Sequence, residues 1–406
     1  MSHYHPLTLD EAVALARSIP NHFSEQAELL SEEIGDGNLN LVFRITDAKT
    51  RKGIIIKQAL PYAKVVGESW PLSLDRARIE REALQIQYAL VPDLVPAVFN
   101  FDNDLAVTVM EDLSDHTIMR KGLIDGHHYP LFAEHIGKFI AHTLFYTSDL
   151  GMNQQQKKEQ LARFINPDLC KISEDLIFED PYRDSPNNNI PESIRTDAEA
   201  LWNDKELKLE IALLRESFLT HTEALLHGDL HTGSIFVTAS STKVIDPEFA
   251  YYGPMGFDIG AVIGNLLLNY AAQPGWSATA NKLNSQREFL LQTILNVWEH
   301  FESNFIALWN RDIVDITATT PGYQDIYIQK ILRDTIGFAG AKMIRRIVGL
   351  SHVADVDTIE DEYVRIHAQR TALRIGTSLV KLGRKATHIQ EIITIAKAAV
   401  LEEVRQ

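Results

Sequence analysis

The hydrophobic pattern of the chain changes near residue 113, and this change limits the folds that it can adopt. Before that point, runs such as "LVFRIT" and "GIIIK" alternate with Gly, Asn and Asp, which indicates strands joined by tight turns. One amphipathic helix, "SLDRARIEREALQIQYAL", interrupts them, and Thr8-x-x-Glu11 predicts a short helix before them. Strands followed by helices indicate an α+β fold with a small β-rich lobe and a larger, mostly helical lobe.

Beyond residue 113 the helical pattern covers residues 127–150 and 196–226. The segment 179–197 between them, rich in Pro, Asn and Asp, is predicted to be an exposed loop. Two short strands, "SIFVT" and "KVIDPEF", then precede helices that continue to the end.

Composition excludes some classes of function. With 39 basic and 55 acidic residues, the 406-residue chain has a net charge of −16, which argues against sequence-independent nucleic-acid binding. The single cysteine, Cys170, excludes an intramolecular disulfide and fits a reducing compartment. No 18 consecutive apolar residues occur, so we expect a soluble cytoplasmic protein without a membrane segment.

Candidate phosphate-binding groups occur in the β-rich part. Gly35 and Gly37 form a turn between two strands, where backbone N–H groups can approach phosphate oxygens, although most such turns are only turns. Lys57 ends an apolar strand and either reaches the surface or pairs with a carboxylate or phosphate. Glu80 and Glu82 in the following helix are candidate carboxylates.

Three carboxylates after residue 225 form a second candidate cluster. In "HGDLHTGS", Asp229 follows a glycine that permits a tight turn, so its carboxylate can project into a cleft and accept a hydroxyl proton. Asp246 and Glu248 follow a β-branched pair and offer the hard oxygen ligands that suit Mg²⁺. The alternative for this pair is a solvated turn.

The ordered set of these motifs matches the parts used for phosphoryl transfer from ATP. The chain resembles the protein-kinase-like superfamily and, within it, the methylthioribose kinase family. The motifs that carry this resemblance are "GDGNLNLVF", "VVGESWPL", "VMEDL", "HGDLHTGSI" and "DPEFAYYGPMGFDIG", and it spans roughly residues 30–375. It implies a bilobal protein-kinase-like fold, with a nucleotide-binding lobe over residues 1–113 and a catalytic and substrate-binding lobe over 114–406.

The resemblance also implies roles for individual residues. Asp229 is expected to be the catalytic base, and Asp246 and Glu248 are expected to hold Mg²⁺ against ATP. The remaining nucleotide contacts are expected from Lys57 oriented by Glu80, from Asn40, and from backbone groups of Met110, Glu111 and Leu113. Asp258 is expected to cap a helix and brace the catalytic loop.

Two positions leave the interpretation open. Ser234 stands where protein kinases place a metal-binding Asn, so it is a weaker candidate ligand and the number of metal ions is undecided. His227 is expected to brace the loop, whereas His231 is either structural or phosphate-facing.

Arg345 and Arg346 lie in the apolar stretch "IGFAGAKMIRRIVGL" and need anionic partners. Either both form ordinary buried ion pairs, or at least one contacts the sugar and the transferring phosphate. The resemblance favours the second alternative.

The activity implied by the resemblance is ATP-dependent phosphorylation of the anomeric 1-hydroxyl of 5-methylthioribose, a step of methionine salvage, by a homodimer. Two alternatives stay open: a kinase for another small alcohol, of choline or aminoglycoside type, and a nucleotide-binding regulator without turnover. The arginine pair argues against cationic substrates.

Overall fold

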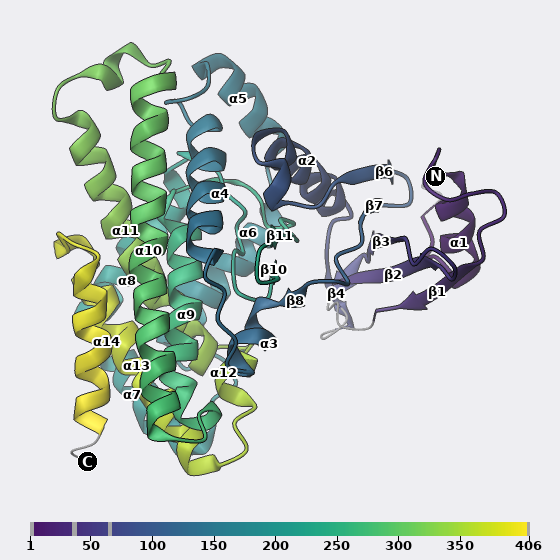
Figure 1. The fold of residues 1–406 in the computed structure, drawn as a ribbon. Coiled ribbons are helices and arrows are strands. Elements are labelled where there is room, and N and C mark those ends of the chain that lie inside the picture. The colour runs from purple at the N-terminus through teal and green to yellow at the C-terminus, as the bar shows by residue number, and fades with distance from the viewer. Residues whose placement is uncertain (1–3, 35–38, 64–66, 404–406) are drawn as a thin grey trace.

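The computed structural model describes residues 4–34, 39–63 and 67–403, so the predicted glycine turn at Gly35 and Gly37 lies outside the described residues. The fold is α+β, as predicted: a sheet near the N-terminus lies beside a large group of helices (Figure 1). The five strands are antiparallel, in the order β1 (Leu29–Glu33), β2 (Asn40–Asp47), β3 (Gly53–Ala59), β7 (Val107–Glu111) and β6 (Val98–Asp102).

Two helices accompany this sheet. Helix α1 (Leu9–Ser18) begins with the predicted capping box of Thr8 and Glu11, and its buried Ala12 and Ala16 belong to the same apolar cluster as β2, β3 and β7. Helix α2 (Asp75–Leu90) packs Ile79 and Ala83 against Leu225 and Tyr252 in the later part of the chain. Because α2 contacts both parts, residues on it can join the sheet to the helical lobe.

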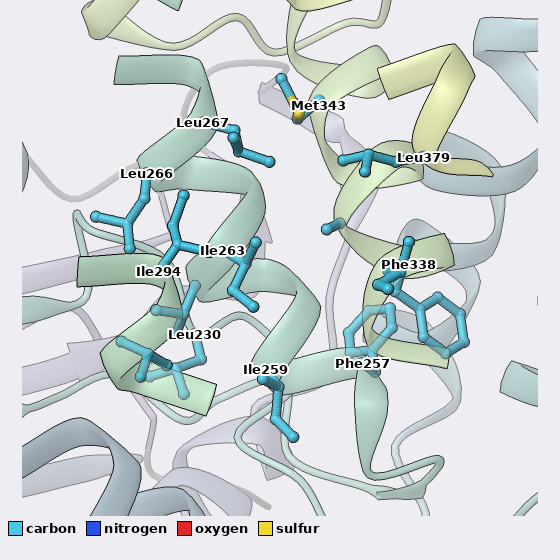
Figure 2. Close-up of a cluster of buried hydrophobic side chains, with 14 of the residues drawn as sticks. Leu230, Phe257, Ile259, Ile263, Leu266, Leu267, Ile294, Phe338, Met343 and Leu379 are labelled. Carbon is cyan, nitrogen blue, oxygen red and sulfur yellow. The ribbon is translucent and has the colours of Figure 1, made fainter. Parts of the chain in front are cut away.

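The helical lobe has one continuous apolar core. Figure 2 shows part of it, where Phe257, Phe338 and Leu379 from three different helices lie on the right of the view and Leu230 lies on the left. The helices are α3 (Met119–Ile124), α4 (Phe132–Tyr146), α5 (Gln154–Arg163), α6 (Pro167–Ser173), α7 (Arg195–Asn203), α8 (Lys205–Thr220), α9 (Gly256–Trp276), α10 (Ala280–Asp312), α11 (Tyr323–Val348), α12 (Ala354–Asp357), α13 (Glu362–Leu382) and α14 (Gln390–Glu403). Short strands complete the structure: β4 (Tyr62–Ala63), β5 (Gly67–Pro71), β8 (Thr117–Ile118), β9 (Ala224–Leu225), β10 (Ile235–Val237), β11 (Thr242–Val244) and β12 (Tyr252–Gly253).

Helices α9 and α11 approach each other closely along a glycine seam. A Cβ atom at Gly260 would lie 2.8 Å from the carbonyl oxygen of Thr335, and one at Gly264 would lie 2.8 Å from that of Ala339. Only glycine allows this approach, because any side chain would overlap the facing backbone. The seam fixes the position of α11 against the loop that precedes α9.

The prediction of an exposed loop over residues 179–197 is confirmed for much of the segment, including Asp184, Asn187 and Ser193, but not for its start. Asp180 and Tyr182 are buried, and the Asp180 carboxylate accepts hydrogen bonds from Arg183, Ser185 and Asn187. These polar side chains satisfy Asp180, so it can be buried despite its charge. No helix within the described ranges is both long and apolar enough to cross a membrane.

Candidate active site

The segment "HGDLH" forms a tight loop between β9 and β10. Gly228 has a φ of +84°, and a Cβ there would lie 2.1 Å from the carbonyl oxygen of Phe249, so the predicted need for glycine is confirmed. The Asp258 carboxylate accepts the backbone N–H groups of His227 (2.7 Å) and Gly228 (3.0 Å). Its bracing role is therefore confirmed, but the predicted cap is wrong, because Asp258 lies inside the first turn of α9.

Hydrogen bonds hold both histidines of the loop in place. Nδ1 of His227 accepts the N–H of Asp229 (3.2 Å), and Nε2 lies 2.8 Å from the carbonyl oxygen of Ile245, which confirms the predicted brace. Nδ1 of His231 accepts the N–H of Gly233 (3.0 Å), so Nε2 carries the proton. Burial lowers the pKa of His231 to about 4, which leaves the ring uncharged at pH 7.

Asp229 lies between a histidine ring and the cations of α11. Nε2 of His231 is 3.3 Å from Oδ2, and Nζ of Lys342 on α11 is 3.6 Å from Oδ1. Burial raises the pKa of Asp229, but His231, Lys342 and Arg345 outweigh this effect and hold it well below its usual value. The carboxylate is therefore ionised throughout the neutral range.

Neither arginine of the predicted pair forms an ion pair within the described part of the chain. Arg346 donates to the carbonyl oxygen of Ser351 (3.3 Å), and burial together with Arg345 lowers its pKa to about 9. Burial also lowers the pKa of Arg345, which Asp229 partly opposes. The alternative of two ordinary ion pairs is wrong, and the positive charge of α11 is available for an anion.

The lysine of β3 is paired as predicted and does not reach the surface. Nζ of Lys57 lies 2.8 Å from Oε1 of Glu80 and also contacts the Asp246 carboxylate. Glu82, the other candidate, instead pairs with Arg78 and Arg163. Burial raises the pKa of Glu80 to about 7. Burial also acts to raise the pKa of Asp246, but Lys57 and the nearby histidines together outweigh it, so the pKa of Asp246 falls below the usual value.

Glu80, Asp246 and Glu248 bring carboxylate oxygens within 4.8 Å of one another. Asp246 follows β11 in a left-handed conformation with a φ of 70°, which turns it out of the strand direction. Arg76 of α2 donates to Oε2 of Glu248 (2.7 Å) and to the side chain of Asn40 (2.7 Å).

These residues fit a divalent cation. Of the three carboxylates, Glu80 has a raised pKa and is already paired with Lys57, so Asp246 and Glu248 are the candidate ligands. One oxygen on each of Asp246 and Glu248 has no hydrogen-bond partner among the residues that the structure describes, and such oxygens are the ligands that Mg²⁺ prefers. The Ser234 hydroxyl instead donates to the carbonyl oxygen of Asp229 (3.2 Å).

A cavity of about 240 Å³ lies between the sheet and the helical lobe and reaches this cluster. Its walls are mainly apolar, and Lys57, Glu80 and Asp246 also line it. The predicted hinge residues Met110, Glu111 and Leu113 form one side, but the N–H of Glu111 already donates to Ala97 (2.9 Å). The other apolar lining residues include Val42, Ile55, Phe236 and Ile245.

Known proteins are similar in sequence to almost the whole chain. Residues 31–290 match the phosphotransferase enzyme family. A methylthioribose kinase of Geobacillus sp. (strain WCH70) is 52% identical over 398 residues, which cover 98% of this chain and 97% of the relative. The chain belongs to the methylthioribose kinase family. Another methylthioribose kinase, of Geobacillus thermodenitrificans (strain NG80-2), is 53% identical over 93% of each chain. The solved choline kinase of Cryptosporidium parvum Iowa II covers 97% of this chain with 15% identity and a TM-score of 0.46.

As a member of the methylthioribose kinase family, the protein is a phosphotransferase. The sequence motifs predicted the loop of Asp229 and the carboxylate cluster around Lys57, but not two cations, Arg76 and Lys342. The signal for Lys342 was present, because "KMIRR" places a third cation in the same apolar helix. Arg76 had no such signal, since it is one of several arginines on α2.

Proposed function

We propose that the protein transfers the γ-phosphoryl group of ATP to the anomeric 1-hydroxyl of 5-methylthioribose, giving 5-methylthioribose 1-phosphate and ADP, in methionine salvage. The observation that carries the proposal is the ionised carboxylate of Asp229 near two arginines that form no ion pair among the described residues. The carboxylate can accept the proton of an acceptor hydroxyl, and the cations can stabilise the negative charge of the phosphoryl group during transfer.

In this mechanism, Asp229 accepts a hydrogen bond from the 1-hydroxyl and orients its oxygen toward the γ-phosphorus. A new O–P bond forms, the bond from the γ-phosphorus to the bridging oxygen breaks, and ADP leaves with the electron pair. The hydroxyl proton passes to the Asp229 carboxylate. The transition state of phosphoryl transfer is loose, so a carboxylate of low pKa can serve, because orientation matters more than basicity.

The nucleotide is proposed to occupy the cavity between the lobes. Its apolar walls suit the adenine ring, and Lys57, oriented by Glu80, suits the phosphates. Asn40 lies on the same wall, and backbone groups of Met110 and Leu113, with the carbonyl oxygen of Glu111, remain the proposed adenine contacts. Asp246 and Glu248 would hold Mg²⁺, which when bound neutralises phosphate charge.

The charge around Asp229 also separates this proposal from kinases of cationic substrates. A choline or aminoglycoside acceptor would bring positive charge next to Lys342, Arg345 and Arg346, at an electrostatic cost that a neutral sugar avoids. A regulator without turnover is not favoured, since the family consists of phosphotransferases.

The direct test is release of ADP from ATP and Mg²⁺ with a panel of acceptors: 5-methylthioribose, ribose, choline and kanamycin. We expect saturable turnover with 5-methylthioribose, weak turnover with ribose, and none with the two cations. Turnover with choline or kanamycin alone would contradict the proposed substrate while leaving the kinase chemistry intact.

We further propose a cytoplasmic homodimer whose nucleotide and catalytic lobes cover residues 1–113 and 114–406. The resemblance to the family supports the dimer, and the single cysteine fits a reducing compartment. Light scattering measures the mass in solution, and a value near 45.8 kDa would contradict the dimer.

A further inference from the structure

Lys342 is a buried cation that the proposed chemistry has not yet used. Its side chain is 5% exposed, and Nζ has no hydrogen-bond partner among the described residues. Nζ lies 4.1 Å from the centre of the Phe257 ring, which is part of the core around Leu230 and Phe338 (Figure 2). The carboxylate nearest to it in an ion pair is that of Asp229, at 3.6 Å.

A purely structural role does not explain this lysine. An ammonium that is buried without hydrogen bonds loses its hydration free energy. Its contact with one aromatic ring compensates only part of this loss. Replacing such a group by an apolar side chain of similar volume is often neutral or stabilising for the fold. Met343 and Ile344 show that apolar side chains fit the neighbouring positions of α11.

Of the groups around Asp229, Lys342 interacts with the carboxylate in a different way from His231 and Arg345. His231 is neutral at pH 7 and offers Oδ2 a hydrogen bond rather than a charge. Arg345 is charged but forms no ion pair with Asp229 within the described residues. Lys342 is the cation in an ion pair with Oδ1, so it acts most directly on the carboxylate.

We propose that Lys342 is a positioning residue for phosphoryl transfer, whose ammonium holds the Asp229 carboxylate ionised and oriented toward the acceptor hydroxyl. This inference rests on the proposed function. Lys342 acts through Asp229, and it does not line the cavity assigned to the nucleotide. Its removal is therefore expected to reduce the rate of transfer and to leave ATP binding unchanged.

The test compares Lys342→Met and Lys342→Arg with a matched control, Lys330→Met. Lys330 lies on the same helix and is paired with Asp334 and Glu223, three turns away from Lys342. We expect Lys342→Met to lower kcat on the order of 10²-fold with an unchanged KM for ATP. Lys342→Arg keeps the charge and is expected to recover part of that loss, while Lys330→Met changes stability and not kcat.

The pH profile adds a second measurement. The charged groups that face Lys342 are Asp229 in the loop, Asp258 on α9, and Arg345 and Arg346 on its own helix. Burial lowers the pKa of Lys342 to about 8, so its charge, and with it kcat, is expected to fall as the pH rises through that value. In Lys342→Arg this alkaline limb should move to higher pH, and in Lys330→Met it should stay.

Failure of this inference differs from failure of the proposed function. Each variant is compared with the wild type using whichever acceptor releases ADP, including water in the slow hydrolysis of ATP. A folded Lys342→Met variant with more than half of the wild-type kcat would overturn the inference, as would an equal loss in Lys330→Met. If Lys342→Met fails to fold, Lys342→Gln replaces it under the same criteria.

Discussion

At the scale of single residues, the site depends on how each carboxylate is surrounded. Asp229 is ionised because Lys342 and Arg345 outweigh its burial, whereas burial dominates at Glu80 and raises its pKa to about 7. Asp246 lies beside Lys57 and has a lowered pKa. The surroundings of Asp229 suit a carboxylate that receives a proton, and those of Glu80 and Asp246 suit carboxylates that bind cations.

Asp229→Asn tests the residue to which the proposed chemistry assigns the proton. The amide keeps the size of the side chain but cannot accept the proton, so kcat is expected to fall by about 10²- to 10⁴-fold. Steady-state kinetics and the thermal unfolding curve should be measured on the same preparation. Near-normal turnover by the folded variant would remove Asp229 from its proposed role.

Residue types in order were enough to predict Lys57 and the carboxylates of the candidate site, but not Arg76, Lys342 or most of the hydrogen-bond partners. The pairing of Lys57 with Glu80 was implied by the resemblance to the kinase family, whereas the apolar strand alone left a surface position open. The tautomer of His231 could not be predicted, because it depends on the N–H of Gly233 pointing at Nδ1. Lys342 lies 113 positions from Asp229, and only the packing of α11 brings the two together.

At the scale of elements, α2 joins the two lobes through a buried network. The Arg76 guanidinium, 2% exposed, contacts Glu248, Asn40 and the carbonyl oxygens of Leu39 and Leu60. It therefore links the candidate metal ligand Glu248 to the start of strand β2. The hydrophobic pattern predicted α2 but not this network. The periodicity of apolar residues indicates which face of a helix is buried, but it does not indicate the hydrogen-bond partners of a polar side chain.

Arg76→Met is expected to lower the free energy of unfolding by about 3–5 kcal/mol, because it leaves the Glu248 carboxylate buried without its cation. The double variant Arg76→Met/Glu248→Gln should recover part of this loss, since the uncompensated charge is removed. Arg78→Met, on a more exposed part of α2, is the control and should cost less than about 1 kcal/mol. Denaturant unfolding measures all three, and equal losses in the single and double variants would contradict the explanation.

At the scale of the whole molecule, each lobe is proposed to supply part of one reaction. The sheet and α2 carry Lys57, Arg76 and one wall of the cavity proposed for the nucleotide, and the helical lobe carries the loop with Asp229 and the cations of α11 (Figure 1). The change of pattern near residue 113 predicted this division of fold. The burial of Asp180 could not be predicted, because it depends on polar side chains further along the segment that satisfy its carboxylate.

The measurement that tests the central claim most directly is the position of the phosphate in the product. Purified protein should be incubated with ATP, Mg²⁺ and 5-methylthioribose, and the sugar phosphate analysed by ³¹P and ¹H NMR spectroscopy. We predict a phosphorus coupled to the anomeric proton, formed in equal amount to ADP. A phosphate coupled to another ring proton, or ADP released without any sugar phosphate, would contradict transfer to the anomeric hydroxyl.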